Sequence, residues 1–158
     1  MVEIHNTVTK VFEENKEALE IFECKDEFSD TQNFCDHYGF DIEDSCNAIL
    51  IKAKKPKEFY AMFCVLGSTR LDVNQKAKTA MGAKRVSFAS REEAEEVTNQ
   101  TYGGISPLGL PDNIKIFIDE NVMSREKLFI GAGNRVSKFF LSPESLVDLT
   151  DAEVLDLT

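Results

Sequence analysis

Two strongly apolar runs near the middle of the chain limit the folds that are open to it. They span 48–53 and 59–66, and a short segment with three lysines and a proline separates them. Runs of this length that are bounded by a turn signal predict a hairpin-like pair of central strands. A sheet is therefore expected to run through the middle of the fold.

Shorter segments around this pair alternate irregularly between strand and helix patterns. This irregular order favours an α+β fold with a mixed, curled sheet over a regular doubly wound one. At 158 residues the chain fits one ordinary domain, which we assign to 1–158. The expected helices span about 7–16, 29–38, 72–81 and 90–98, with a last one from 142, and the expected strands span 18–22, 85–88, 114–118, 127–131 and 136–141.

Charge is distributed unevenly along the chain, which has a net charge of −10. Residues 52–85 hold 9 basic and 2 acidic side chains, whereas the segments on either side are acidic. A local basic patch of this kind suits a short RNA end, while the acidic remainder would repel a long duplex, so DNA is not an expected partner. The alternative is a solvated face of unrelated lysines.

The chain begins without the basic and apolar regions of a secretory signal, and no stretch approaches the roughly 18 apolar residues of a membrane span. Its four cysteines form no CxxC pair. These features predict a cytoplasmic protein with reduced thiols and no membrane partner.

Several common catalytic motifs are absent from the sequence. There is no HExxH, no P-loop, no GxGxxG after a strand and no zinc-like spacing of cysteine and histidine. We therefore expect neither a metal nor a cofactor. His5 and His37 are isolated, and each is expected to be a surface or core histidine rather than a base.

The segment 98–109 contains the most distinctive pattern, GGISPLG. Gly103 and Gly104 lack Cβ atoms, so a ligand can approach their backbone closely, and Pro107 fixes the exit of the turn. We expect the N–H groups of Gly104, Ile105 and Ser106 to be free to donate to an oxyanion or a ribose. The same composition also makes an ordinary tight turn.

The order of these features over roughly 45–148 resembles the YbaK/ProX family of free-standing aminoacyl-tRNA deacylases, which is related to the editing insertion of bacterial prolyl-tRNA synthetase. Each motif is weak alone, but their order is specific. The motifs are Asn47-Ala48-Ile49-Leu50-Ile51, Arg70-Leu71-Asp72, Met81-Gly82-Ala83-Lys84-Arg85, Ala89-Ser90-Arg91-Glu92-Glu93, the GGISPLG loop, Ile118-Asp119, Gly131-Ala132-Gly133 and Leu141-Ser142-Pro143-Glu144-Ser145-Leu146.

The resemblance implies a barrel-like sheet of six to seven strands flanked by short helices, and hydrolysis of the ester of a mischarged aminoacyl-tRNA without a metal. It implies that the acylated 3′ end of tRNA lies against Gly103 to Pro107, whose backbone orients the substrate and the attacking water, and that a synthetase is a further partner. The implied catalytic residues are Gly103, Gly104, Ser106, Pro107 and Asn47, and the implied substrate-binding residues are Ala48, Ile105, Asp119, Gly131, Gly133 and Lys52.

The sequence departs from the family pattern at two places. Family members usually carry a lysine where this chain has Asn47, and the usual Thr-Gly-Tyr before the loop reads Thr98-Asn99-Gln100. An amide can donate hydrogen bonds but supplies no charge. Lys52 or Lys54 is a candidate replacement, although strand alternation places Lys52 on the face opposite Asn47.

Three functions therefore stay open. The first is an active trans-editing hydrolase, and the second is a binding module for aminoacyl-tRNA or an amino acid that has lost catalysis. The third is a structural or regulatory domain with no connection to tRNA, which the overall acidity keeps open.

Overall fold

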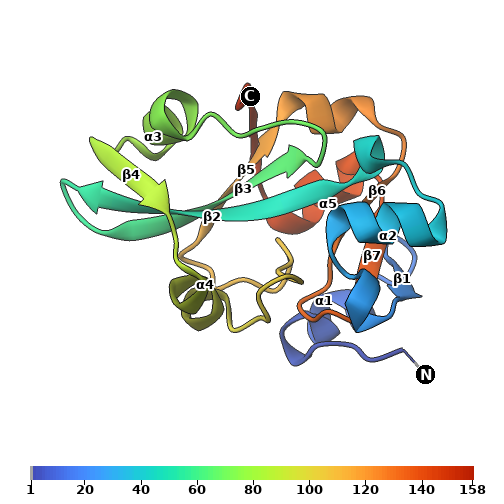
Figure 1. Ribbon diagram of the computed structural model, residues 1–158. Helices are drawn as coiled ribbons and strands as arrows, with labels where there is room; N and C mark the ends of the chain where they lie inside the picture. Colours follow the sequence, from blue (N-terminus) through green and yellow to red (C-terminus); the bar gives the residue numbers. More distant parts are fainter. Residues whose placement is uncertain (1) are drawn as a thin grey trace.

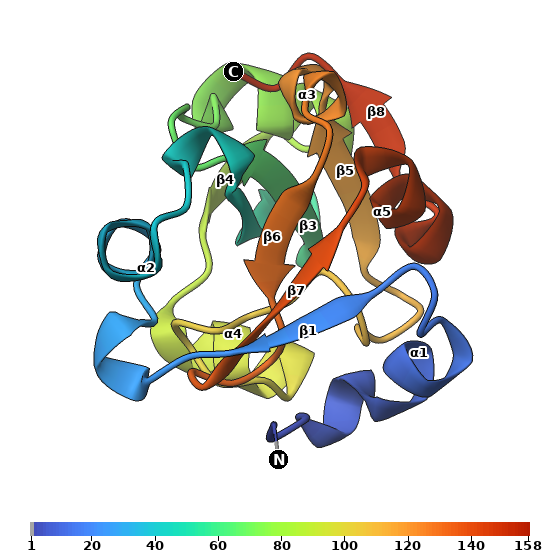
Figure 2. The ribbon, with the colours of Figure 1, turned by 90° about the vertical axis from the view of Figure 1, so that its right-hand side faces the viewer.

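The computed structural model describes residues 2–158, and eight strands in this range form two sheets (Figures 1 and 2). The five-stranded sheet has the order β4-β2-β3-β5-β8, and the three-stranded sheet has the order β1-β7-β6. The strands are β1 (Glu20–Glu23), β2 (Cys46–Lys55), β3 (Phe59–Leu66), β4 (Arg85–Phe88), β5 (Lys115–Asp119), β6 (Leu128–Gly131), β7 (Ser137–Leu141) and β8 (Glu153–Leu155).

Five α-helices and several single turns of helix connect and cover the strands. The α-helices are α1 (Thr9–Glu14), α2 (Thr31–Tyr38), α3 (Lys78–Met81), α4 (Arg91–Thr98) and α5 (Pro143–Thr150). The 3₁₀ turns are Asn6–Val8, Asp26–Phe28, Ile42–Asp44 and Glu120–Ser124, and a π-helical turn, Val73–Ala77, leads into α3. Within residues 2–158 no helix has the length and apolar character needed to cross a membrane.

The central hairpin expected from the sequence is confirmed. β2 and β3 pair antiparallel from Cys46 opposite Leu66 to Ala53 opposite Phe59. β4 extends the sheet beside β2, while β5 and then β8 add on in parallel beyond β3. Both faces of β2 are covered, because Leu50 packs into one core cluster and Ile51 into another.

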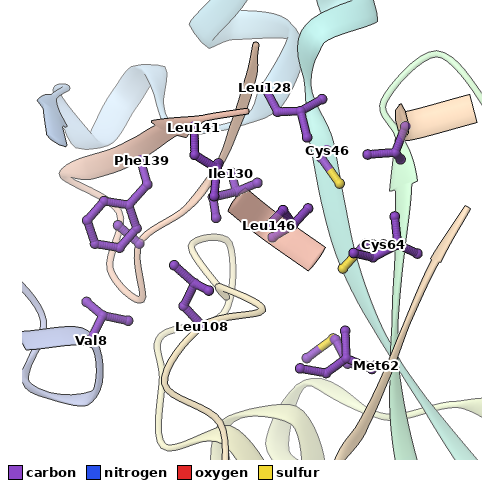
Figure 3. Close-up of a cluster of buried hydrophobic side chains, with 14 of the residues drawn as sticks. Val8, Cys46, Met62, Cys64, Leu108, Leu128, Ile130, Phe139, Leu141 and Leu146 are labelled. Carbon is purple, nitrogen blue, oxygen red and sulfur yellow. The ribbon is translucent and has the colours of Figure 1, made fainter. Parts of the chain in front are cut away.

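The largest core cluster lies between the two sheets. In Figure 3 the side chains of Leu128, Ile130 and Leu141 on the smaller sheet lie in one core with Cys46 on β2 and Cys64 on β3. In Figure 1, α3 and α4 lie on opposite sides of the five-stranded sheet, and each packs into a different core cluster. An aromatic cluster fixes α2 against the outer face of the smaller sheet through Phe34, Phe129 and Phe140.

The helix boundaries follow the capping signals of the sequence. Ser90 and Glu93 form a reciprocal capping box at the start of α4, and the Ser142 side chain accepts from the Ser145 N–H at the start of α5. α2 ends at Gly39, whose φ of 79° is in the left-handed region. These local signals place the loops that form the site described below.

The α+β class is confirmed, but the two sheets do not close into a barrel, and the strands number eight within residues 2–158. Within residues 2–158 one isolated bridge, from Ser45 to Phe129, connects the sheets. Their apolar faces pack against each other across the core cluster, so the sheets are layered rather than joined edge to edge. The strand missed from the sequence is β8, a short segment whose first two residues, Glu153 and Val154, are exposed.

Candidate functional site

A cavity of about 490 Å³ lies where the start of α2, the first half of β2, the loop after α4 and the smaller sheet meet. Five of the residues that the sequence singles out line it. They are Asn47, Ala48, Gly103, Ile105 and Gly131.

The glycine loop is fastened to the turn between β6 and β7. The Gly133 N–H donates to the Gly104 carbonyl at 2.7 Å, and the Thr101 N–H donates to the Gly133 carbonyl at 2.9 Å. A Cβ on Gly104 would clash with the backbone carbonyl of Asn134, so only glycine permits this close approach. Gly103 has a φ of 91°, which also favours glycine.

The expectation of three free loop donors is wrong for two of them. The Gly104 N–H donates to the Thr101 carbonyl at 3.0 Å, and the Ser106 N–H donates to Oε1 of Gln100 at 2.5 Å. Among the described residues, the N–H groups of Gly103 and Ile105 have no hydrogen-bond acceptor. Both residues line the cavity, so two loop donors remain available there.

Ser106 and Pro107 are buried behind the loop instead of facing the cavity. The Ser106 hydroxyl accepts from the Leu108 N–H at 3.1 Å, while Pro107 lines a different hollow near α5. Gln100 is 3% exposed and also donates through Nε2 to the Leu108 carbonyl at 2.9 Å. Gln100 therefore fixes the conformation of the loop through two hydrogen bonds. The sequence showed only that Thr98-Asn99-Gln100 departs from the family pattern and did not predict this role.

Asn47 lines the same cavity as the loop, at the start of β2. Its Oδ1 accepts from the hydroxyls of Thr31 and Ser45, each at 3.2 Å. With the carbonyl oxygen used in this way, the amide Nδ2 is the group that remains able to donate. Thr31 at the first turn of α2 thus orients Asn47, which ties the helix to the cavity wall.

Three other residues implied by the resemblance lie outside the cavity lining. Lys52 is bonded to Glu93 at 2.7 Å, Gly133 packs against His5, and Asp119 is fully buried and accepts from the Leu157 N–H at 2.8 Å. Strand alternation explains Lys52, which leaves β2 on the face opposite Asn47. Asp119 instead fixes the end of the chain, because it pairs with Leu155 of β8 and its side chain binds the Leu157 N–H.

Lys138 lines the same cavity although the sequence reasoning did not select it. It is the second residue of β7, is 6% exposed, and its Nζ is 5.0 Å from the centroid of the Phe34 ring. Burial lowers the pKa of its ammonium, and the charge of Arg135 adds to this shift. A lysine directly before the apolar residues 139–141 was the signal that could have identified it.

One cysteine, Cys46, lines the cavity within the described part of the chain. A hydrogen bond with Cys64 and complete burial raise the pKa of the Cys46 thiol well above its ordinary value. Since the thiolate is the nucleophilic form, this thiol is poorly suited to attack a substrate. The polar groups of the cavity are therefore suited to binding and orienting a ligand.

Two exposed aromatic side chains border the cavity. Phe88 at the end of β4 is 62% exposed, and Tyr102 is 47% exposed beside Gly103. The guanidinium of Arg91 lies 5.6 Å from the centroid of the Tyr102 ring. Phe88 also lines a neighbouring hollow, which Arg70 and Asp72 border as well.

The sequence profile of the aminoacyl-tRNA editing domain matches residues 25–149, which include every residue that lines the cavity. The chain belongs to the aminoacyl-tRNA editing domain family. This membership confirms the resemblance drawn from the order of the sequence motifs.

Two relatives of this editing-domain protein illustrate the range of the family. A candidate Cys-tRNA(Pro)/Cys-tRNA(Cys) deacylase, EbsC, of Enterococcus faecalis (strain ATCC 700802 / V583) is 28% identical over 92 residues, which cover 58% of this chain and 56% of that protein. Proline–tRNA ligase of Nautilia profundicola is 33% identical over 106 residues, which cover 66% of this chain and 18% of the ligase. The chain therefore matches only part of each relative.

Solved structures share the fold of this editing domain at low sequence identity. The crystal structure of a candidate trans-editing enzyme for prolyl-tRNA synthetase superposes with a TM-score of 0.83 at 22% identity, over 99% of both chains. The hypothetical protein APE2540 superposes with a TM-score of 0.86 at 22% identity, over 96% of this chain and 99% of that one.

Proposed function

We propose that this protein hydrolyses the ester bond that links a mischarged amino acid to the 3′ end of tRNA. The main support is the unpaired N–H groups of Gly103 and Ile105 at a cavity of about 490 Å³. This volume falls within the range of about 300–1,000 Å³ that is common for small-ligand sites. Membership of the editing domain family supports the same reaction.

The reaction needs positioning and stabilisation of charge more than a strong side-chain base. Water adds to the ester carbonyl, the carbonyl oxygen becomes negative, and the bond to the ribose oxygen then breaks. The proton of the water passes to the ribose oxygen, so the products are the free amino acid and deacylated tRNA. Fixed N–H donors aimed at the negative oxygen typically contribute about 3–4 kcal/mol each to such a step.

The rim of the cavity suits the nucleotide part of the substrate. Exposed aromatic rings bind unpaired bases by stacking, and neighbouring arginines attract the phosphate backbone. Phe88 and Tyr102 provide the rings, and Arg91 and Arg70 provide the charge. In our proposal the terminal adenosine occupies the rim and the ester reaches the glycine loop.

The wall formed by β2 and α4 suits the aminoacyl part. Ala48, Ile49, Leu50 and Ala94 line it with small or aliphatic side chains. The volume left between them would determine which acyl groups enter.

Aminoacyl-tRNA synthetases produce mischarged tRNA. In our proposal the protein therefore acts in the cytoplasm, after a synthetase has released its product.

A panel of mischarged tRNAs tests this function. The purified protein is expected to accelerate deacylation of at least one member, and Gly103→Ala is expected to lower that rate because an alanine at a φ of 91° displaces the loop. Gly39→Ala is the matched control, since Gly39 has a φ of 79° with no atom near its Cβ position and lies at the far end of α2. No acceleration for any tRNA would reject the proposal.

A binding module is the second candidate function, and Asn47 is the observation that favours it. Its amide can hydrogen-bond a substrate but brings no charge to the reaction. If the protein binds acylated RNA without hydrolysing it and Asn47→Lys creates hydrolysis, the binding module is the better description. Hydrolysis by the unaltered protein excludes it.

A further inference from the structure

Lys138 is buried without a partner of opposite charge. It is 6% exposed, and no hydrogen bond or ion pair joins its Nζ to any residue in 2–158. Asp119 Oδ2 is sealed from solvent and has no hydrogen-bond partner among the described residues. Lys138 Nζ is not sealed from solvent in this way. Nζ therefore keeps some contact with solvent, and Lys138 lines the cavity.

The acidic residue that lines the cavity with Lys138 already has a partner. Asp30, which also lines the cavity, accepts from Nη1 of Arg135 at 3.3 Å, and the same guanidinium bonds Asp26 at 3.1 Å. Arg135 thus pairs with the one carboxylate that lines the cavity in the described part of the chain. A buried ammonium without a partner is unfavourable, so its presence in β7 beside Phe139, Phe140 and Leu141 calls for a functional reason.

The register of the smaller sheet brings Lys138 and the glycine loop to the same place. Lys138 lies opposite Gly131 in the β6–β7 pair. The loop lies directly on Gly131, because a Cβ there would clash with the Ile105 carbonyl and lie 2.8 Å from the Gly104 carbonyl. Lys138 and the free N–H groups of Gly103 and Ile105 therefore border one space.

We propose that Lys138 is a catalytic residue of this cavity, whose ammonium binds the oxygen that becomes negative when water adds to the ester carbonyl. This inference rests on the proposed function. The ammonium acts together with the N–H groups of Gly103 and Ile105, and it stays protonated throughout. Because its charge interacts most strongly with the negative intermediate, Lys138 lowers the barrier more than it tightens ground-state binding.

The closing experiment compares the wild-type protein with Lys138→Met, which has a similar length and no charge. The variant is expected to lose about 100- to 1,000-fold in kcat for a hydrolysed mischarged tRNA, with a change in KM of less than about threefold. Lys127→Met is the matched control, because Lys127 also lies near an aromatic ring of the smaller sheet, 5.8 Å from the Phe140 centroid, but outside this cavity. An unchanged kcat in Lys138→Met overturns the inference, and so does a loss confined to KM.

A second measurement separates this inference from the proposed function. Adenosine carrying a 3′-methylphosphonate is an anionic mimic of the intermediate, and 3′-acetamido-3′-deoxyadenosine is a neutral mimic of the substrate. Titration calorimetry is expected to show that Lys138→Met weakens binding of the phosphonate by 10-fold or more and leaves binding of the amide unchanged. If the protein shows this result but hydrolyses no substrate, Lys138 forms an anion site and the proposed hydrolase function is rejected. Equal weakening of the binding of both mimics rejects the role of Lys138.

Chemical rescue distinguishes a charge from a structural contribution. Lys138→Ala leaves space at an open cavity, so ethylammonium is expected to restore part of the lost kcat, while choline at the same ionic strength is too large to do so. A purely structural role of Lys138 predicts no difference between the two cations.

Discussion

Lys138 on β7 lies opposite Gly131 on β6, and the two residues line the same cavity. One brings a charge to the cavity wall, and the other brings the glycine loop close because it has no side chain. The smaller sheet is therefore a wall of the site as well as a partner in the core.

The burial of Lys138 leads to a prediction about stability. Lys138→Met is expected to raise the free energy of unfolding at neutral pH, by at most roughly 1–3 kcal/mol, because the ammonium is largely buried and has no hydrogen-bond partner within the described residues. For a chain of this size each kcal/mol corresponds to about 2–4 °C in Tm. Thermal denaturation followed by circular dichroism measures the shift. A lower Tm would show that the ammonium has a stabilising partner in the folded protein.

Gly131→Ala is expected to disable the site from the opposite strand. The new Cβ would push the loop away from β6, and a displacement of about 1 Å can reduce catalysis about 100-fold. Deacylation rates and Tm are measured for each variant. Gly82→Ala is the control, because it places alanine at a φ of 63° where no atom lies near the new Cβ. Equal activity of the two variants would mean that the position of the loop is unimportant.

The sequence predicted most elements of the fold because their signals are local. The Ser90–Glu93 capping box, the glycine at the end of α2 and the alternating runs of the central hairpin each depend on residues that are close along the chain. The packing of the two sheets face to face was not predictable in this way, since it depends on contacts between distant strands.

The site was only partly predictable for the same reason. The pattern GGISPLG identified the loop, but the acceptors that occupy the Gly104 and Ser106 N–H groups come from Thr101 and Gln100 through the folded shape of the loop. Asp119 was a plausible polar residue, yet its partner is the Leu157 N–H near the end of the chain. Lys138 stands out in the sequence as a lysine beside apolar residues, but its place at the cavity depends on strand register, which the local sequence does not show.

Glu93 gives a prediction about pH. Hydrogen bonds from Lys52, the Ser90 N–H and Tyr60 lower the pKa of its carboxyl from 4.5 to about 2. A carboxyl with a lowered pKa in the folded state stabilises the protein above its unfolded pKa, and this contribution is lost as the pH falls through the folded value. Glu93→Gln is therefore expected to be less stable than the wild type at pH 7, with a difference that shrinks between about pH 4.5 and about pH 2.

Urea denaturation at pH 7, 4 and 2.5 measures that difference for Glu93→Gln. Glu92→Gln is the control, since it removes the same charge from the first turn of α4 at an exposed position. A difference between wild type and Glu93→Gln that does not depend on pH would show that the capping hydrogen bonds, and not the carboxylate charge, determine the effect.

The aromatic rim gives the last prediction. Stacking of a base on an aromatic ring contributes about 1–3 kcal/mol, which corresponds to a change of about 5- to 150-fold in binding. Phe88→Ala and Tyr102→Ala are each expected to raise KM for an acylated RNA within this range and to leave kcat nearly unchanged, because the rings bind the nucleotide and not the ester. Phe59→Ala is the control, since Phe59 is 38% exposed on β3 but lies outside the cavity. If all three variants behave alike, the terminal base is bound elsewhere, and if kcat falls for the rim variants alone, the rings also position the ester against Gly103.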